Sequence, residues 1–174
     1  MNGFAIAILA VIAIIIAVFA VDFFCLKVKR YRLSTPKIPR AAEGLSIVML
    51  TDLHERRFGK DNCRLIRKVE ELMPDLIVLC GDIVDRYGET GGSYVSLFEA
   101  LPKIAPTIMV FGNHDYSTKR TGELAAVAED AGIQILEDAC VEFQKNGAVI
   151  NVIGVADYLR ESVVVHTAAK RFDR

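Results

Sequence analysis

Hydrophobic positions divide the chain into an apolar N-terminal segment and a longer part in which short apolar runs alternate with amphipathic ones. The segment from Gly3 to Val21 is a run of 19 residues without a charged, amide or hydroxyl side chain. As a helix it would extend about 28 Å, which is close to the hydrocarbon thickness of a bilayer. We therefore expect one transmembrane helix, within a membrane anchor at residues 1–26 that contacts lipid through residues 3–26.

Two other interpretations of this segment fit the sequence less well. A cleaved signal peptide carries positive charge before its apolar stretch, whereas the basic residues of this chain follow the stretch. A buried core helix needs surroundings that enclose it, and no later segment is hydrophobic enough on all sides. Since basic residues beside a membrane helix tend to stay in the cytoplasm, we expect a single-pass protein whose larger part is cytoplasmic.

Beyond a basic linker at residues 27–44, the pattern changes to that of a folded domain covering residues 45–174. Apolar residues at helical spacing fill Asp61–Met73 up to Pro74 and Tyr94–Leu101 up to Pro102. These two segments alternate with short apolar runs that we interpret as buried strands, at Leu45–Leu50, Leu76–Cys80 and Thr107–Phe111. Alternation of strands and helices predicts a layered α/β domain.

The pattern after residue 120 predicts one more helix and then a hairpin. Glu123–Ala131 fits a helix that ends at Gly132. Apolar runs follow that we interpret as strands, at Ile133–Leu136, Cys140–Phe143 and Ala148–Val155. The last two are joined by Asn146-Gly147, a pair favoured in tight hairpin turns.

Composition and charge narrow the possible function. The chain has 174 residues, of which 52% are hydrophobic and 25% are charged, enough for one ordinary domain. Six basic residues and no acidic one lie between Lys27 and Arg40, whereas from Ala41 onward 15 Lys and Arg face 21 Asp and Glu. This acidic balance argues against a general nucleic-acid binder. The four cysteines form no CxxC pair, so a zinc ribbon or disulfide scaffold is not expected.

Polar residues of the kind that bind metals follow each of the first three predicted strands. Asp52 and His54 follow the first strand, Asp82 follows the second, and Asn113 follows the third. Because the carboxyl ends of neighbouring strands in an open α/β sheet meet at one edge, we expect these side chains to converge there. The sequence therefore predicts a metal site at this edge.

The residue types also indicate which chemistry the site performs. Asp52 and His54, two positions apart, can point to one side of an extended segment and bind the same ion. Asp82 can bridge two ions through its two oxygens, and the Asn113 amide oxygen can bind the second ion. Two divalent ions about 3.5–4 Å apart can clamp a phosphoryl group and acidify a bridging water. This arrangement is typical of phosphoester hydrolysis.

Each motif taken alone has a plainer interpretation. An Asp-x-His after a strand can be a capping aspartate with a surface histidine, and Gly-Asp can be simple turn chemistry. The occurrence of three such motifs after three successive strands favours the metal site. Gly81 and Gly112 precede two of the motifs, and we expect them to allow close backbone turns beside it.

The three blocks Asp52-x-His54, Gly81-Asp82-x-x-Asp85 and Gly112-Asn113-His114-Asp115 resemble those of the calcineurin-like metallophosphoesterase family, especially its membrane-associated bacterial branch. The resemblance implies a layered β-sandwich flanked by helices, with an αββα architecture. It also implies two divalent metal ions, with Mn, Fe or Zn as the expected elements. The residues that this resemblance identifies as metal ligands are Asp52, His54, Asp82 and Asn113, with Asp82 bridging.

The resemblance also implies roles for two further residues and a departure from the family pattern. His114 would contact the phosphate and protonate the leaving-group oxygen, and Asp115 would hold the His114 ring in place. Family members continue to a Gly-His-x-His block that this sequence lacks. His166, after Val163-Val164-Val165, is either a substitute ligand or a surface residue. We therefore expect a truncated domain whose sandwich is incomplete at the C-terminus.

The leading hypothesis is thus a membrane-anchored, metal-dependent phosphoesterase that hydrolyses phosphate monoesters or diesters. Its position beside a bilayer makes lipid-linked phosphoesters reasonable substrates. The alternative is a catalytically inactive fragment that acts as a membrane-bound binding module or has no function. The oligomeric state is not predicted by any feature of the sequence.

Overall fold

The computed structural model describes residues 3, 8–16, 26–86, 92–118 and 120–156, and the chain divides into a unit at residues 1–33 and a unit at residues 34–174. In the first unit, residues 8–16 are helical. The other residues of the predicted anchor, except residue 3 and residue 26, lie outside the described residues. None of the described helices has the length and hydropathy expected of a membrane span.

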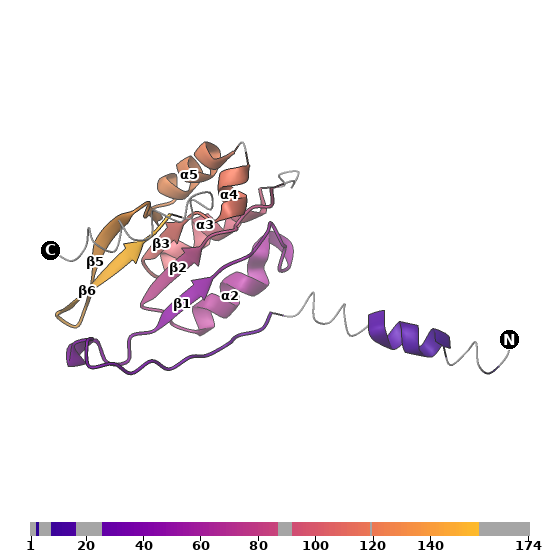
Figure 1. Ribbon diagram of the computed structural model, residues 1–174, viewed down its shortest axis with the longest axis horizontal. Coiled ribbons are helices and arrows are strands. Elements are labelled where there is room, and N and C mark those ends of the chain that lie inside the picture. The colour runs from indigo at the N-terminus through magenta and orange to yellow at the C-terminus, as the bar shows by residue number, and fades with distance from the viewer. Residues whose placement is uncertain (1–2, 4–7, 17–25, 87–91, 119, 157–174) are drawn as a thin grey trace, which may run out of the picture. The chain divides into compact units, whose positions relative to one another are not determined.

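A four-stranded parallel sheet forms the centre of the second unit (Figure 1). Its strands are β1 (Ile47–Leu50), β2 (Leu76–Cys80), β3 (Thr107–Val110) and β4 (Gln134–Ile135), in the spatial order β1-β2-β3-β4. In this register Val48 lies beside Ile77, and Ile77 lies beside Thr107. All four strands fall within the predicted apolar runs, and the prediction of a layered α/β domain is confirmed.

The helices lie on one face of this sheet, because right-handed connections between strands in sequential order place each crossover on the same side. A short 3-10 turn, η2 (Lys60–Asn62), leads into the first of them. The helices are α2 (Cys63–Glu71), α3 (Ser93–Ile104), α4 (Asn113–Ser117) and α5 (Thr121–Asp130). Ile77 and Met109 of the sheet are fully buried on this face, together with Leu101 and Leu124 of the helices.

The bounds of the predicted helices differ from those observed by a few residues, and two of these differences have a local explanation. Helix α2 begins at Cys63 and not at residue 61, because Asp61 and Asn62 adopt left-handed backbone angles with φ of 51° and 55°. Helix α3 continues through Pro102, which was expected to end it. Pro102 lies in the last turn, where the missing N–H removes one hydrogen bond without breaking the helix core.

The hairpin after the parallel sheet is confirmed. Strands β5 (Ala139–Lys145) and β6 (Ala148–Gly154) pair antiparallel, with Lys145 opposite Ala148. The two turn residues, Asn146 and Gly147, have φ of 50° and 79°. Positive φ at both positions is the geometry of a type I′ turn, for which Asn-Gly is the preferred pair.

The hairpin packs on the sheet face opposite the helices. Leu76, Ile108 and Leu136 form a buried cluster there. Hydrophobic side chains of the sheet and hairpin pack against that cluster, namely Val78, Val110, Ala139, Val141, Phe143 and Val152. The described part of the second unit thus has three layers: helices, the parallel sheet and a two-stranded antiparallel sheet.

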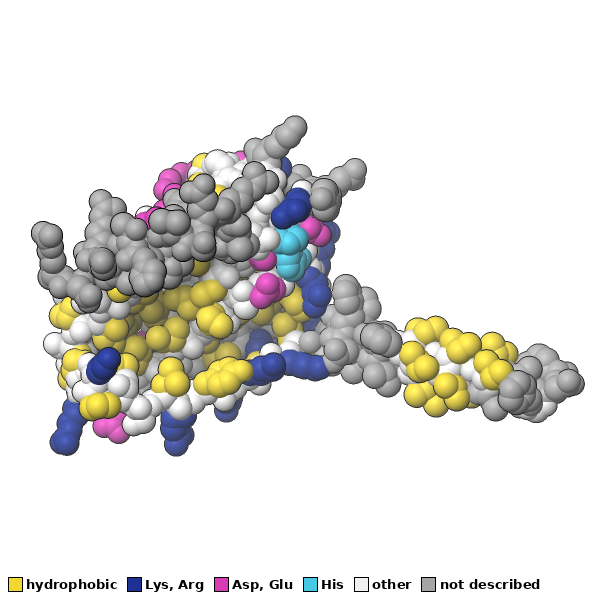
Figure 2. Space-filling model, in the orientation of Figure 1, with side chains coloured by type: hydrophobic (Ala, Val, Ile, Leu, Met, Phe, Trp, Pro, Cys, Tyr) yellow, Lys and Arg dark blue, Asp and Glu magenta, His cyan; other side chains and the backbone are white. Residues whose placement is uncertain are grey.

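Strand β1 lies beyond the reach of the hairpin. Its residues Ile47 and Met49 pair with positions on the hairpin-covered face of β2, yet Met49 is 62% exposed. Figure 2 shows hydrophobic side chains gathered on one side of the globular unit. The incompleteness of the sandwich at the C-terminus stays a prediction, and residues 157–174 lie outside the described residues.

Candidate metal centre

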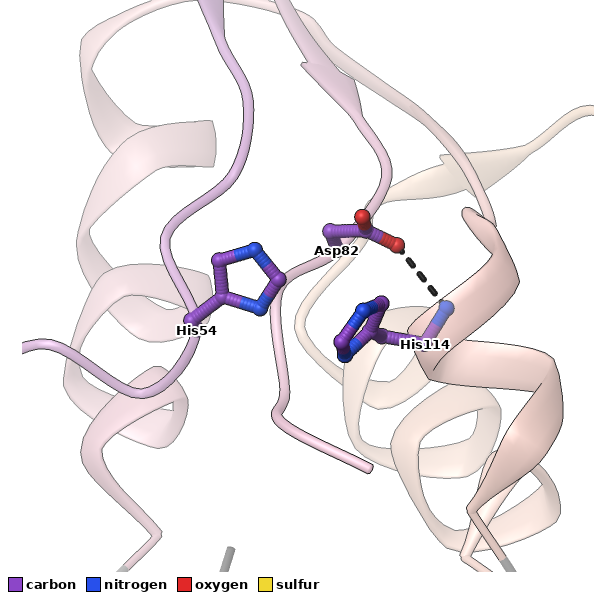
Figure 3. A group of neighbouring side chains, drawn as sticks. All are labelled: His54, Asp82 and His114. Carbon is purple, nitrogen blue, oxygen red and sulfur yellow. Dashed lines mark hydrogen bonds between the residues drawn. The ribbon is translucent and has the colours of Figure 1, made fainter. Parts of the chain in front are cut away.

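Three loops meet at the carboxyl edge of the parallel sheet, as the strand order requires. His54 follows β1, Asp82 follows β2, and His114 lies in α4 directly after β3. One ligand atom from each of these three side chains lies within 4.8 Å of the others. Figure 3 shows the His54 ring directed toward Asp82 and the His114 ring. Of the four residues that the sequence predicted to converge at this edge, His54 and Asp82 belong to this group, and the third member is His114.

Backbone hydrogen bonds join the loop after β1 to the loop after β2. The His54 amide donates to the Asp82 carbonyl at 2.9 Å, and the Glu55 amide donates to the Ile83 carbonyl at 2.9 Å. The two loops therefore continue the pairing of the strands beyond their ends. This pairing fixes the spacing between the His54 and Asp82 side chains.

The backbone at Asp52 and His54 is not extended as expected, since φ is 54° and 46° at these positions. Asp82 has a φ of 53° as well. Left-handed angles cost a non-glycine residue about 1–3 kcal/mol each, and they persist only where surrounding contacts impose them. The His54 Nε2 atom lies 4.0 Å from Asp52 Oδ1, so the turn brings these two side chains together without an extended segment.

Asp52 lies at the exposed margin of the group. Its side chain is 64% exposed, and it is not one of the three side chains whose ligand atoms converge. The Thr51 hydroxyl oxygen lies 2.9 Å from both Asp52 Oδ2 and the Cys80 carbonyl oxygen. Thr51 thus ties the Asp52 carboxylate to the end of β2, beside the rest of the site.

The Asp82 carboxylate is oriented by the neighbouring loop. Its Oδ1 atom accepts a hydrogen bond from the His114 backbone amide at 2.9 Å, drawn as a dashed line in Figure 3. A carboxylate oxygen can accept more than one interaction, so this contact leaves both Asp82 oxygens able to bind a cation.

Two glycines allow the loops after β2 and β3 to approach at backbone distance. A Cβ atom on Gly81 would lie 2.6 Å from the Gly112 Cα, and one on Gly112 would lie 2.3 Å from Asp82 Oδ1. Gly81 also has a φ of 74°. The expected role of these glycines is confirmed, since any side chain there would displace Asp82 or the facing loop.

Asp115 has a different role from the one expected. Its carboxylate accepts hydrogen bonds from the amides of Ile83 and Val84, both at 3.0 Å, and from the Gly112 amide at 2.9 Å. The side chain is fully buried. Burial raises its pKa above the ordinary value, and the peptide N–H groups oppose that rise. Asp115 therefore holds the two loops together and does not orient the His114 ring.

Asp85 takes the place beside the His114 ring. The Arg86 backbone amide donates a hydrogen bond to His114 Nδ1 at 3.4 Å, and Asp85 Oδ1 lies 3.4 Å from the same nitrogen. The rings of His114 and His54 meet edge to face, with centroids 4.6 Å apart. The sequence carried a signal for Asp85 in the spacing Gly81-Asp82-x-x-Asp85, but spacing alone did not distinguish a ring partner from a loop-stabilising group.

For Asn113 and His166, no contact between the side chain and the three converging residues is found among the described residues. Asn113 is the first residue of α4 and precedes His114, so it lies at the same sheet edge. Its backbone carbonyl accepts a hydrogen bond from the Ser117 hydroxyl. His166 lies outside the described residues. The ligand role of Asn113 stays a prediction.

Two half-buried side chains, Glu55 and Arg120, each carry one polar atom that is fully buried. Within the part of the chain that the structure describes, Glu55 Oε1 and Arg120 Nη1 are buried without a hydrogen-bond partner. The Arg120 Nη2 atom pairs with Glu123 at 2.8 Å. Burial raises the pKa of the Glu55 carboxyl, and the Arg120 charge opposes that rise. Sequence spacing carries no information about such tertiary burial.

The donor set of this centre fits a transition-metal ion. Imidazole nitrogens and a carboxylate oxygen suit Mn, Fe or Zn, whereas oxygen ligands alone would suit Ca or Mg. The His54 and His114 side chains are each about one-third exposed. Figure 2 shows histidine side chains at the surface beside acidic ones, where an ion and a substrate can reach them.

Comparison with known proteins identifies the relatives of this chain. The family model for calcineurin-like phosphoesterases matches residues 45–168. An uncharacterized metallophosphoesterase of Bacillus subtilis, YkoQ, is 31% identical over 123 residues, covering 68% of this chain and 45% of that protein. A transmembrane protein with metallophosphoesterase domain from Danio rerio is 28% identical, over 65% of this chain and 26% of its own.

A third relative has a named substrate. The UDP-2,3-diacylglucosamine pyrophosphatase LpxG of Chlamydia muridarum is 32% identical over 96 residues, covering 53% of this chain and 29% of that protein. The chain thus spans less than half the length of each of these three relatives.

Proposed function

Because the chain belongs to the calcineurin-like phosphoesterase family, we propose that it is a metal-dependent hydrolase of phosphoester bonds. The observation that carries this proposal is the convergence of His54, Asp82 and His114, whose ligand atoms lie within 4.8 Å of one another. A carboxylate and an imidazole that can hold a metal ion thus lie beside a second imidazole that can transfer a proton, at the carboxyl edge of a parallel sheet where ligands bind.

We propose that the ligands of two divalent ions are Asp52, His54, Asp82 and Asn113, with Asp82 between the ions. The distance of 4.0 Å between His54 Nε2 and Asp52 Oδ1 supports a shared ion for these two side chains. When bound, such ions acidify water and offset the charge that develops on a phosphoryl group. Mn, Fe and Zn are the elements that this donor set favours.

His114 is the proposed proton donor to the leaving-group oxygen. Its ring lies beside the proposed ligand His54, with ring centroids 4.6 Å apart. The Arg86 backbone amide donates to Nδ1, which leaves the proton of the neutral ring on Nε2 for transfer, and the Asp85 carboxylate, 3.4 Å from Nδ1, lies where it can orient the ring. Asp115 supports this arrangement indirectly, by fixing the loops that carry Asp82 and His114.

We also propose that residues 1–26 anchor the protein in a membrane, that residues 27–44 link the anchor to the phosphoesterase domain, and that this domain lies in the cytoplasm. The apolar run from Gly3 to Val21 supports the anchor, and the basic residues after it support the orientation. Two relatives support a membrane setting by their names, one as a transmembrane protein and one as a pyrophosphatase of a diacylated sugar nucleotide. Lipid-linked phosphoesters are therefore the proposed substrate class.

A hydrolase assay with matched variants tests the proposal. We expect the full chain, loaded with Mn²⁺, to hydrolyse p-nitrophenyl phosphate or its bis ester. Asp82→Asn and His114→Ala should each lower kcat at least 100-fold, because each removes a ligand or a proton donor. The control Asp130→Asn makes the same chemical change at an exposed position of α5 and should leave kcat unchanged. Equal turnover in all three variants, or a folded and metal-loaded chain without turnover, would contradict the proposal.

A further inference from the structure

The segment from Lys27 to Arg40 is exposed along its whole length. All fourteen residues are exposed, and the segment contains six basic residues and no acidic one. A solvated segment with this density of positive charge attracts anionic surfaces.

Most of the positive charges of this segment have no ion pair among the described residues. Among the described residues, no ion pair involves five of its cations, which are Lys29, Arg30, Arg32, Lys37 and Arg40. Residues 26–35 adopt neither helix nor strand. The side chains are therefore available to an external partner.

Large apolar side chains are interleaved with these cations. Tyr31 is 81% exposed and Leu33 is 90% exposed, and Val28 and Ile38 are exposed as well. The exposed aromatic and aliphatic side chains of this charged segment can be removed from water at a lipid interface. Aromatic rings favour the headgroup level of a bilayer, and apolar side chains gain by insertion below it.

We infer that residues 27–40 bind the anionic surface of a membrane. The basic side chains contact lipid phosphates, and Tyr31 and Leu33 insert at the level of the headgroups. This binding is separate from phosphoester hydrolysis and does not depend on the metal centre. It gives the linker a function of its own, in addition to joining the anchor to the domain.

A lipid surface fits this segment better than a nucleic acid does. The apolar run from Gly3 to Val21 precedes the segment and is typical of a lipid-facing sequence. Aliphatic side chains such as Leu33 also have no stacking role on bases.

A single introduced tryptophan tests the inference in the full chain, because the protein contains no Trp. The substitution Tyr31→Trp replaces an exposed aromatic residue by another. After reconstitution in vesicles, we expect its emission to shift to shorter wavelength and to be quenched by brominated lipid when phosphatidylglycerol makes up about 30% of the bilayer. In pure phosphatidylcholine the shift should be absent, and about 0.5 M salt should reverse it.

A charge variant and its matched control complete the experiment. With Lys29→Gln, Arg30→Gln and Arg32→Gln added, the ratio of bound to free tryptophan should fall about 100-fold, since each cation contributes about fivefold to binding. Three exposed cations of the globular unit serve as the control, changed as Lys60→Gln, Arg67→Gln and Lys103→Gln, and should leave the ratio unchanged.

Three outcomes would overturn the inference. These are an equal shift in phosphatidylcholine and phosphatidylglycerol vesicles, an equal loss of binding in the control, and release of the tryptophan from anionic vesicles by poly(U) at equal phosphate concentration. The last result would assign the segment to nucleic acid. All substituted positions are exposed, and the salt dependence of the variant that carries Tyr31→Trp alone tests the inference without the charge variants.

Discussion

The position of the Asp82 carboxylate depends on the absence of a side chain at Gly112. A Cβ atom there would lie 2.3 Å from Asp82 Oδ1 and 2.6 Å from the Asp82 nitrogen. Contacts this short cannot be relieved by rotation of a side chain alone, because the Asp82 backbone is involved. The carboxylate and its loop must therefore move if Gly112 gains a methyl group.

We predict opposite effects for alanine at two glycines. Gly112→Ala should destabilise the protein by about 1–3 kcal/mol, the usual effect of a steric insertion into a packed site, and should weaken Mn²⁺ binding. Gly122→Ala is the control, because a Cβ atom there meets nothing within 4 Å and alanine favours helix α5 by up to about 1 kcal/mol. Urea unfolding measures both values. Similar stability changes of the same sign would contradict the steric explanation.

The His114 ring leads to a second prediction at the scale of single residues. If Asp85 orients the ring through Nδ1, at 3.4 Å, Asp85→Asn should lower kcat about 10–100-fold with little change in KM. The exposed Asp61→Asn serves as the control for loss of one carboxylate charge. Steady-state kinetics with p-nitrophenyl phosphate provides the measurement. An unchanged kcat in Asp85→Asn would show that Asp85 does not position the His114 ring for catalysis.

Among the secondary-structure elements, the hairpin is tied to the parallel sheet by one carboxylate. Asp75, directly before β2, pairs with Lys145 at the end of β5. The same carboxylate accepts a hydrogen bond from the Ser46 amide, ahead of β1, at 2.9 Å. The Lys145 hydrogen bond is the main cause that lowers the Asp75 pKa below its usual value, and the Ser46 amide adds to it.

This carboxylate predicts a pH dependence of stability. Because the pKa of Asp75 is lower in the folded protein than its ordinary 3.8, its stabilisation is present above pH 3.8 and is lost as the pH falls through the folded-state value. Asp75→Asn should therefore lower the free energy of unfolding by about 1–2 kcal/mol at pH 7 and by much less below pH 3.

Urea unfolding at both pH values tests that difference. The exposed pair of Lys68 and Glu71 provides the control, and Glu71→Gln should change stability by less than about 1 kcal/mol. A stability difference between wild type and Asp75→Asn that is as large at pH 2.5 as at pH 7 would exclude the ionised carboxylate as its origin.

The secondary elements were predictable where the signal is local. The apolar run at Leu76–Cys80 has the bounds of β2, and Asn146-Gly147 forms the expected hairpin turn. The left-handed backbone at Asp52 and His54 was not predictable, because it depends on hydrogen bonds to the loop after β2. The role of Asp115 was missed for the same reason, since its partners are backbone amides that come into reach only when the loops meet.

At the scale of the whole chain, the described globular unit keeps one part of its sheet uncovered. The hairpin covers β2 and β3, whereas Ile47 and Met49 of β1 stay exposed. An exposed apolar strand at the edge of a sheet favours pairing with other chains. Self-association of the purified protein is therefore expected to begin at β1.

A lysine on this strand tests the expectation. Met49→Lys should reduce light scattering on concentration and change the free energy of unfolding by less than about 0.5 kcal/mol, because the side chain is already exposed. The adjacent Val48→Lys places the same charge on the buried side of β1. It should lower the free energy of unfolding by more than about 3 kcal/mol. A large loss of stability in Met49→Lys would mean that this face is covered in solution.

Titration of the full chain with Mn²⁺, followed by electron paramagnetic resonance of the free ion, most directly tests whether the three loops form a metal centre. We predict saturable binding that weakens at least tenfold in His54→Ala and in Asp82→Asn and is unchanged in Asp130→Asn. Absence of saturable binding by the folded protein, or equal affinity in all of these variants, would contradict the account.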